Sequence, residues 1–336
     1  MDINDEEREL ASSIGLYHYR GISHHQGIIS QLSYSPDWKE IASCSFDGKV
    51  IKIWNIESGD ARELKGHTKR ITCLKFSPNS KLLASCADDA TIRLWDIKSG
   101  KFKILRELDF YPKSFGFSPD GKQIVSIGEL DNIALWNVSN GQFLELPINS
   151  FNPNFHPLVN FSPDGKRIFW TDKKNSIAQY EVESRYSKSL FDTLPKNYFD
   201  YYTLNIFAIS AKGMLIAFSL ANGFKDRDQF HYRGGRSSCS NTPEKDKLQI
   251  WDLENERIIK SIDLETCVDS LEFSPDGKKL AYSTYNTIRF LNIEHGNSMA
   301  LSIRVENPSV LTFSPDGSQI AVGSCLGVIR LFDIQE

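Results

Sequence analysis

The chain is poor in the features that build helical bundles or cross membranes. It has only 3 Met among 336 residues, and few long tracts of Ala, Leu, Glu and Lys. No apolar run approaches the ~18–20 residues of a membrane span. Residues 1–10 (MDINDEEREL) are acidic and polar, unlike the basic and then apolar segments of a secretory signal. We therefore expect a protein that is neither secreted nor inserted in a membrane.

An excess of charge of one sign is also lacking. The 39 basic and 43 acidic residues give a formal net charge of −4. A chain with this balance has no overall attraction to nucleic acid or to an anionic membrane. Binding to polyanions would require a local basic segment.

The motifs of common enzymes and metal sites are missing as well. There is no Walker loop, no G-x-S-x-G and no H-E-x-x-H in the sequence. His231 and Cys239 alone are too few ligands for a zinc site. The sequence therefore predicts no metal, no cofactor and no enzymatic activity.

The cysteines do not form pairs with the spacing of zinc ligands. The six cysteines are Cys44, Cys73, Cys86, Cys239, Cys267 and Cys325. Isolated thiols of this kind are typical of small buried side chains in a reducing compartment. We expect the protein to be cytoplasmic.

What the sequence does contain is a repeat. An apolar segment ends in Ser-Pro, a turn of the Asp-Gly type follows, then a segment of small residues, and then I-x-x-W-D/N-I. Most copies follow one another at about 40–45 residues, the period of a propeller blade. The serine of the repeat falls at Ser35, Ser77, Ser118, Ser162, Ser210, Ser274 and Ser314.

Each copy has the pattern of four short strands, a to d, running from the inside of a blade outward. In the second copy the expected strands are 71–76, 81–86, 91–97 and 102–108. One such sheet cannot bury both faces, but sheets stacked around an axis bury each other. The predicted fold is all-β: a seven-bladed β-propeller of four-stranded antiparallel blades.

The propeller is expected to form one domain, residues 14–336, after a polar leader at 1–13. The last copy ends just after its strand c, in LFDIQE. The segment Ile14–Ile22 precedes strand a of the first blade. We expect this N-terminal strand to complete the last blade, because closure removes an exposed sheet edge.

With Gly66-His67 and Trp95-Asp96 in the second copy, the sequence resembles the WD-repeat family, in the bacterial-like type rich in SPDG turns. The resemblance implies buried His–Ser–Asp–Trp hydrogen-bonded tetrads, whose residues would stabilise a blade rather than form a catalytic triad. By position the tetrads would be His25, Ser43, Asp47, Trp54 and His67, Ser85, Asp89, Trp95. The first copy has one extra residue between its Asp and its Trp, and the later copies depart further.

The resemblance also implies that the d–a and b–c loops share one face, called the top. In blades three to five the d–a loops are rich in aromatic residues, which are enriched at protein interfaces. The same rings could alternatively plug the central channel. The candidates for partner binding in these loops are Phe110, Tyr111, Phe155, His156, Tyr198, Phe199 and Tyr201.

A long insertion, residues 222–246, lies in the b–c loop of blade five. Long loops in compact domains are usually functional or disordered. We expect this one to contact a partner, and a solvated excursion is the alternative. Its candidate residues are Arg227, Phe230, His231, Tyr232, Arg233 and Arg236.

These features favour a non-catalytic protein-interaction scaffold or adaptor subunit. Its partners would be one or more proteins of a larger complex, bound at the top face of blades three to five. One alternative is a lactonase-like propeller enzyme that uses the central channel, although no small-molecule substrate is expected. Another is a nucleic-acid-binding module that uses the basic insertion, with strong salt dependence.

Overall fold

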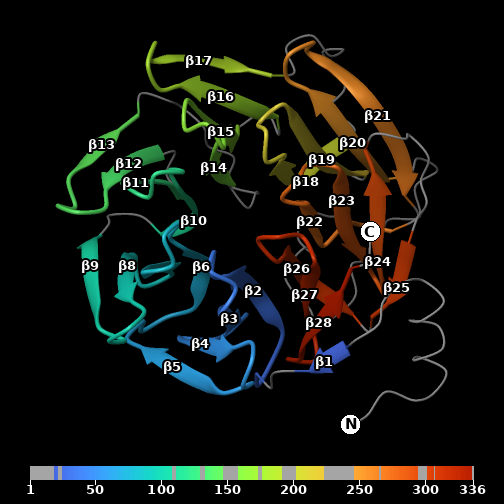
Figure 1. The fold of residues 1–336 in the computed structure, drawn as a ribbon. Coiled ribbons are helices and arrows are strands. Elements are labelled where there is room, and N and C mark those ends of the chain that lie inside the picture. Colours follow the sequence, from blue (N-terminus) through green and yellow to red (C-terminus); the bar gives the residue numbers. More distant parts are fainter. Residues whose placement is uncertain are drawn as a thin grey trace.

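The computed structural model describes residues 19–21, 25–107, 111–128, 133–146, 158–172, 176–190, 202–222, 246–264, 266–293, 301–305 and 307–334. Every regular element within these ranges is a β-strand. The strands form seven four-stranded antiparallel sheets arranged as blades around an axis (Figure 1). The predicted seven-bladed propeller is confirmed. None of the elements described is a helix that could cross a membrane.

The first four blades follow the order of the chain, each with its first strand innermost. Blade one contains β2 (Ile29–Tyr34), β3 (Glu40–Ser45), β4 (Val50–Asn55) and β5 (Ala61–Lys65). Blade two contains β6 (Ile71–Phe76), β7 (Leu82–Ala87), β8 (Thr91–Asp96) and β9 (Phe102–Glu107). Blade three contains β10 (Pro112–Phe117), β11 (Gln123–Gly128), β12 (Ile133–Asn137) and β13 (Phe143–Glu145). Blade four contains β14 (Val159–Phe161), β15 (Arg167–Thr171), β16 (Ile177–Glu181) and β17 (Tyr186–Ser189).

The last three blades continue the same order until the ring closes. Blade five contains β18 (Tyr202–Ile209), β19 (Leu215–Asn222), β20 (Asp246–Asp252) and β21 (Arg257–Leu264). Blade six contains β22 (Ser270–Phe273), β23 (Lys279–Thr284), β24 (Thr287–Asn292) and β25 (Leu301–Arg304). Blade seven contains β26 (Pro308–Phe313), β27 (Gln319–Ser324), β28 (Ile329–Asp333) and β1 (Tyr19–Gly21).

The two ends of the chain meet in blade seven. β1 pairs with β28 in antiparallel register, with Tyr19 opposite Phe332 and Gly21 opposite Arg330. The N-terminal strand therefore completes the last blade, as the sequence predicts. The described strand covers three residues of the predicted segment Ile14–Ile22. This pairing removes the open edge that β28 would otherwise present.

Ser-Pro turns connect the two inner strands in six of the seven blades, as in blade three. The Ser118 hydroxyl donates to the Asp120 carboxylate at 2.7 Å and accepts the Gln123 N–H at 2.9 Å. Gly121 has a φ of 68°, the left-handed conformation that favours glycine. The motif thus satisfies its own polar groups and fixes the angle between strands a and b.

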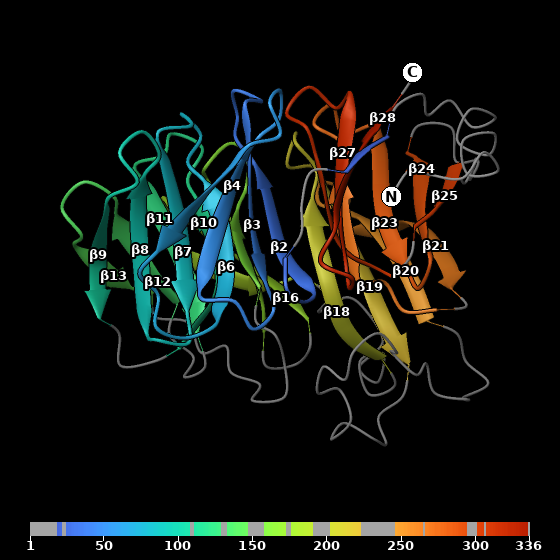
Figure 2. The ribbon, with the colours of Figure 1, turned by 90° about the horizontal axis from the view of Figure 1, so that it is seen from below.

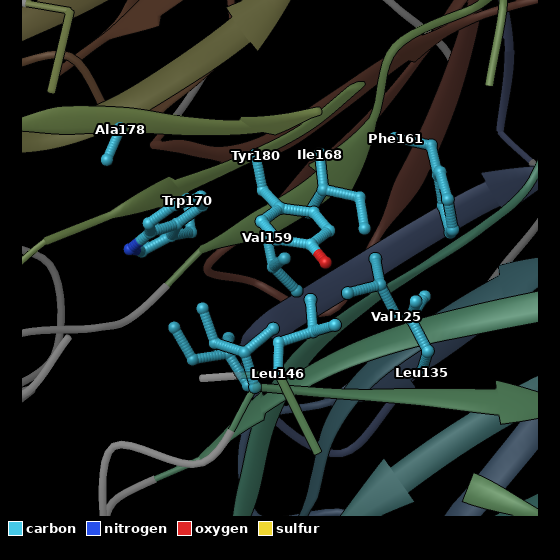
Figure 3. Packing of buried hydrophobic residues seen from close by; sticks show 11 residues of the cluster. Val125, Leu135, Leu146, Val159, Phe161, Ile168, Trp170, Ala178 and Tyr180 are labelled. Atoms are coloured by element: carbon cyan, nitrogen blue, oxygen red, sulfur yellow. The ribbon is translucent and has the colours of Figure 1, made fainter. Parts of the chain in front are cut away.

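The core is divided among the seams between blades. A separate buried hydrophobic cluster fills each of the seven seams. Between blades three and four, Val125 and Leu135 of one blade face Val159, Ile168 and Tyr180 of the next (Figure 3). Each blade is therefore stabilised by its two neighbours, as stacking of half-buried sheets requires.

Polar side chains on the innermost strands also tie neighbouring blades together. The Thr72 hydroxyl donates to the Pro112 carbonyl at 2.8 Å, from blade two to blade three. The Ser309 hydroxyl donates to the Ile29 carbonyl at 2.6 Å, from blade seven to blade one. Between blades six and seven, Glu272 accepts the Phe313 N–H at 3.0 Å.

We expect Glu272→Gln to stabilise the protein at pH 8 but not at pH 5. Burial raises the pKa of Glu272 to about 7, against the opposing effects of its hydrogen bonds and of Lys75. A carboxyl with a raised pKa stabilises the fold while it is protonated, and this stability is lost as the pH rises from 4.5 through 7. The neutral amide can still accept the Phe313 N–H.

Urea unfolding at the two pH values measures the effect. The gain at pH 8 should be about 2 kcal/mol. Equal stability of the variant and the natural protein at both pH values would contradict a buried charge at this seam.

Candidate interaction surface

The antiparallel order of the strands creates two rims with different connections. In each blade the a–b and c–d turns lie at one rim, and the b–c and d–a loops lie at the opposite rim. We call these the bottom and the top rim. The edge-on view in Figure 2 shows the strands of neighbouring blades running between the two rims.

In blade two the four predicted tetrad residues form one hydrogen-bonded chain beneath the top rim. The His67 ring bonds Asp89 Oδ2 through Nδ1 at 2.8 Å and Ser85 Oγ through Nε2 at 2.7 Å. Trp95 Nε1 donates to Ser85 Oγ at 2.8 Å. Since the serine hydroxyl accepts from the indole, its own proton goes to Nε2, and the Nδ1–H donates to Asp89. The neutral imidazole fits this arrangement, and burial lowers the pKa of His67 even though Asp89 opposes the shift.

Asp89 is fixed by further donors. Thr91 donates its N–H at 3.1 Å and its hydroxyl at 2.6 Å, and Thr68 donates its N–H at 3.0 Å. Arg93 lies 3.6 Å from the same carboxylate. Burial alone would raise the pKa of Asp89, but the hydrogen bonds from Thr91, Thr68 and His67 outweigh it and lower the pKa.

Blade one has only three members of its predicted tetrad in place. His25 Nε2 and Trp54 Nε1 each lie 2.8 Å from Ser43 Oγ. Asp47 is exposed and forms no hydrogen bond to His25 within the described part of the chain, so its assignment to the tetrad is wrong.

The reason lies in the b–c turn of blade one. This turn contains one more residue than the turn of blade two, which moves Asp47 away from the imidazole. Val50, which begins β4, occupies the position of Thr91 and has no hydroxyl that could hold the carboxylate. The extra residue is visible in the sequence, but its effect on Asp47 depends on this missing donor.

The tetrad erodes from blade three onward: Leu108 stands at the histidine position of blade three, and the serine position changes from blade four onward. In blade three Trp136 Nε1 still donates to Ser126 Oγ at 2.8 Å. In blades four to seven, larger buried residues occupy the serine position: Trp170, Phe218, Tyr282 and Val322. These side chains fill the space of the lost polar network with apolar contacts. Among the described residues, the Trp170 Nε1–H is buried without a hydrogen-bond acceptor.

Of the partner-binding candidates, the structure describes only Tyr111. Its side chain is 44% exposed at the start of blade three. The Lys69 ammonium lies 5.6 Å from the centre of its ring. The other candidates lie outside the described residues: Phe110, Phe155, His156, Tyr198, Phe199, Tyr201, Arg227, Phe230, His231, Tyr232, Arg233 and Arg236. So does the insertion between Asn222 and Asp246.

Beside Tyr111 the top rim carries a charged network that spans blades one to three. Asp88 accepts from Arg70 Nε at 2.9 Å and pairs with Lys113 Nζ at 3.0 Å. The Arg70 guanidinium lies 4.9 Å from the centre of the Phe46 ring. We call Phe46, Lys69, Arg70, Asp88, Tyr111 and Lys113 the rim platform. Apart from Tyr111, these residues were not predicted from the sequence, because most of them lie in the best-preserved blades, where the loops do not depart from the repeat.

A second group of exposed side chains lies at the top rim of blades six and seven. Tyr285 is 48% exposed and Leu326 is 57% exposed, and both lie in b–c turns. The Asn286 side chain accepts the Asn307 N–H at 3.2 Å, and the Asn307 carbonyl accepts the Cys325 N–H at 2.9 Å, so Asn307 links the two turns. Sequence analysis missed this group too. For Leu326 the signal was a large apolar residue at the turn position where blades one and two carry Asp47 and Asp89.

The class of the protein follows from the fold and from a comparison with known families. A family model described as WD domain, G-beta repeat, matches residues 60–96 and 305–333. The first match includes most of blade two, with Ser85, Asp89 and Trp95. The second covers the three strands that β1 completes. The chain is thus a seven-bladed β-propeller that carries WD40 repeats.

Individual relatives are similar over short stretches. Nuclear distribution protein PAC1-1 of Uncinocarpus reesii is 44% identical over 71 residues, which are 20% of this chain and 16% of that protein. DDB1- and CUL4-associated factor 13 of Xenopus laevis is 39% identical over 71 residues, with the same coverage. Actin-interacting protein 1 of Drosophila melanogaster is 35% identical over 71 residues, 20% of this chain and 12% of that protein. The matches span about a sixth or less of these relatives.

Replacing a tetrad serine by alanine should lower the free energy of unfolding more when that serine is hydrogen-bonded to more buried groups. Ser85 satisfies a buried imidazole and a buried indole, whereas Ser126 satisfies one indole among the described residues. Because each orphaned buried group costs about 1–3 kcal/mol, we expect Ser85→Ala to cost about 3 kcal/mol and Ser126→Ala about 1.5 kcal/mol. Urea unfolding measures both, and equal losses would contradict the difference in bonding.

His25 should make the protein less stable in mild acid. Burial, aided by Lys52, lowers its pKa from 6.5 to about 4 against the opposing effect of Glu63. An imidazole that is neutral when folded binds its proton only on unfolding. Its contribution is therefore complete above pH 6.5 and is lost as the pH falls toward 4. In NMR the His25 ring should titrate near pH 4, and His25→Gln should flatten the decline in stability. Titration near 6.5 would contradict burial of this ring.

Proposed function

We propose that this chain is a non-catalytic protein-interaction scaffold that serves as a subunit of a larger complex. It binds its protein partner through the top face, on the side of blades three to five and the neighbouring rim platform. The observation that carries the proposal is the exposed Tyr111 ring beside charged residues that the top rim already holds in place.

The rim platform has the composition of an interaction site. Tyrosine and arginine supply a large share of binding energy where they are held rigidly. Asp88 bonds both Arg70 and Lys113, so these side chains lose little conformational freedom when a partner binds. Lys69 is exposed and leaves a positive charge beside the Tyr111 ring. The site fits a partner segment that carries a carboxylate next to an apolar group.

The comparisons support a role in protein association. Two relatives are named as an actin-interacting protein and as a factor associated with DDB1 and CUL4. Those names describe association with other proteins, and they concern proteins of which this chain matches only a small share. A scaffold role for this chain accords with both.

A propeller enzyme would need similar ligands at equivalent positions around the channel. One position near the start of the innermost strand can be compared between blades. Its residue instead varies in chemistry from blade to blade. These positions hold Ser30, Thr72, Lys113, Asp269 and Ser309. Ser30, Thr72 and Ser309 are engaged in hydrogen bonds with the backbone of strands. This mixture favours the scaffold role.

Two further assignments belong to this proposal. The SPDG turns that begin at Ser118, Ser162, Ser274 and Ser314 support the SPDG-rich, bacterial-like type of WD repeat. The buried thiols of Cys44, Cys73 and Cys86, which form no disulfide, support a cytoplasmic location, where thiols stay reduced.

The test is capture of partners from extract of the source cells with variants of the top rim. Tyr111→Ala and Lys69→Ala should each weaken retention of the captured protein about tenfold, since an anchor residue contributes 1 kcal/mol or more. Lys122→Ala is the matched control, because this exposed lysine follows an a–b turn at the bottom rim. Titration of the purified partner, once identified by mass spectrometry, measures the loss.

Deletion of residues 224–243 tests the blade-five insertion separately. We expect the deletion to reduce capture of the same partner. Unchanged capture by the deletion and by both top-rim variants would overturn the proposed function.

A further inference from the structure

Trp38 occupies a position in the a–b turn that the other blades reserve for small residues. The turn of blade one is Ser35-Pro36-Asp37-Trp38, and the Trp38 N–H donates to the Ser35 carbonyl at 2.9 Å. Its φ is 63°, in the left-handed region. The equivalent residues in blades two to seven are Ser80, Gly121, Gly165, Gly213, Gly277 and Gly317, with φ values of 59°, 68°, 71°, 66°, 74° and 77°.

The backbone conformation of this tryptophan is unfavourable for the fold. A bulky L-residue in the left-handed region is strained, and such strain is often kept for function. The Trp38 side chain is 46% exposed, whereas the other five tryptophans, Trp54, Trp95, Trp136, Trp170 and Trp251, are at most 6% exposed. Within the described part of the chain, no hydrogen bond is formed by its indole N–H.

The repeat indicates what lies beside Trp38. A Cβ at the equivalent position meets the proline of the preceding blade: at Gly121 it would lie 3.4 Å from Pro78, and at Gly317 it would lie 3.4 Å from Pro275. Blade seven precedes blade one in the ring, and its β26 is tied to β2 by the Ser309 hydrogen bond. The residue at position 38 therefore faces the turn that contains Pro315 and Asp316.

The a–b turns of blades seven and one together carry fewer positive charges than the a–b turns of most other neighbouring blades. The residue after the left-handed position is an exposed lysine in five blades: Lys39, Lys81, Lys122, Lys166 and Lys278. Blade seven carries Ser318 there instead. Asp316 accepts the Ser318 N–H at 3.0 Å and the Ser314 hydroxyl through Oδ1, and its side chain is exposed. Asp37 is exposed as well, and Lys39 is the single cation of the two turns.

We propose that Trp38, Asp37 and Asp316 form a docking point on the bottom rim for an arginine-bearing segment of a partner protein. A planar guanidinium stacks on an indole face and pairs with a carboxylate at the same time. An ammonium group cannot do both equally well, so the site prefers arginine to lysine. This site is separate from the top face and is independent of the proposed function.

The experiment uses the full chain and a library of short random peptides. Peptides are selected on the natural protein, and those that also bind Trp38→Gly are removed. The sequences that remain should be enriched in Arg over Lys. Trp38→Gly and Asp316→Asn should each weaken a selected peptide about tenfold, and Trp38→Tyr should retain most of the binding. Lys122→Ala is the control and should bind as the natural protein does.

Fluorescence reports the contact directly, because Trp38 is the one exposed tryptophan. A bound peptide should protect the emission of Trp38 from quenching by acrylamide. Trp38→Gly should raise the Tm by about 2 °C, since glycine relieves the strained φ.

Three results would overturn the proposal. One is a library that yields no peptide dependent on Trp38. Another is selected peptides without basic residues. The third is a Tm lower for Trp38→Gly than for the natural protein, which would show that Trp38 serves the fold. None of these results bears on capture at the top rim.

Discussion

No blade of this protein can bury both of its faces alone, and this constraint governs the rest of the structure. Each sheet has four short strands, and its apolar side chains enter the clusters on either side of it. The seven clusters therefore depend on one another around the ring. The inner-strand hydrogen bonds from Thr72, Ser309 and Glu272 cross the same seams. Loss of apolar packing at one seam therefore exposes the faces of two blades rather than one.

The sequence predicts most of this architecture because its repeat fixes local geometry. Ser-Pro-Asp-Gly satisfies its own hydrogen bonds, so each copy determines a turn wherever it occurs. The tryptophan of strand c keeps one register throughout, opposite Ile41 in blade one and Leu83 in blade two. Where the tryptophan is replaced, as by Leu291 in blade six, the pairing opposite Leu280 is the same. Fold class and closure follow from these regularities.

The candidate sites were less predictable, because they depend on contacts between copies. Asp47 matches the repeat by type, yet whether it reaches His25 depends on a hydroxyl that Val50 lacks. Arg70 and Asp88 are ordinary loop residues until the fold places Lys113 of the next blade beside them. Trp38 was visible as a departure from SPDG, but its meaning depends on its φ and its exposure. Position in a repeat does not reveal these properties.

The pairing of β1 with β28 joins the first and the last of the described strands in the chain, and this has a consequence during synthesis. Within the propeller β1 is synthesised before the other described strands, and its partner β28 is made more than 300 residues later. Until β28 has been made the ring stays open, and β1 has no partner strand. Contacts so distant in sequence close slowly. The newly made chain therefore passes through a period in which a strand from another molecule could take the place of β1.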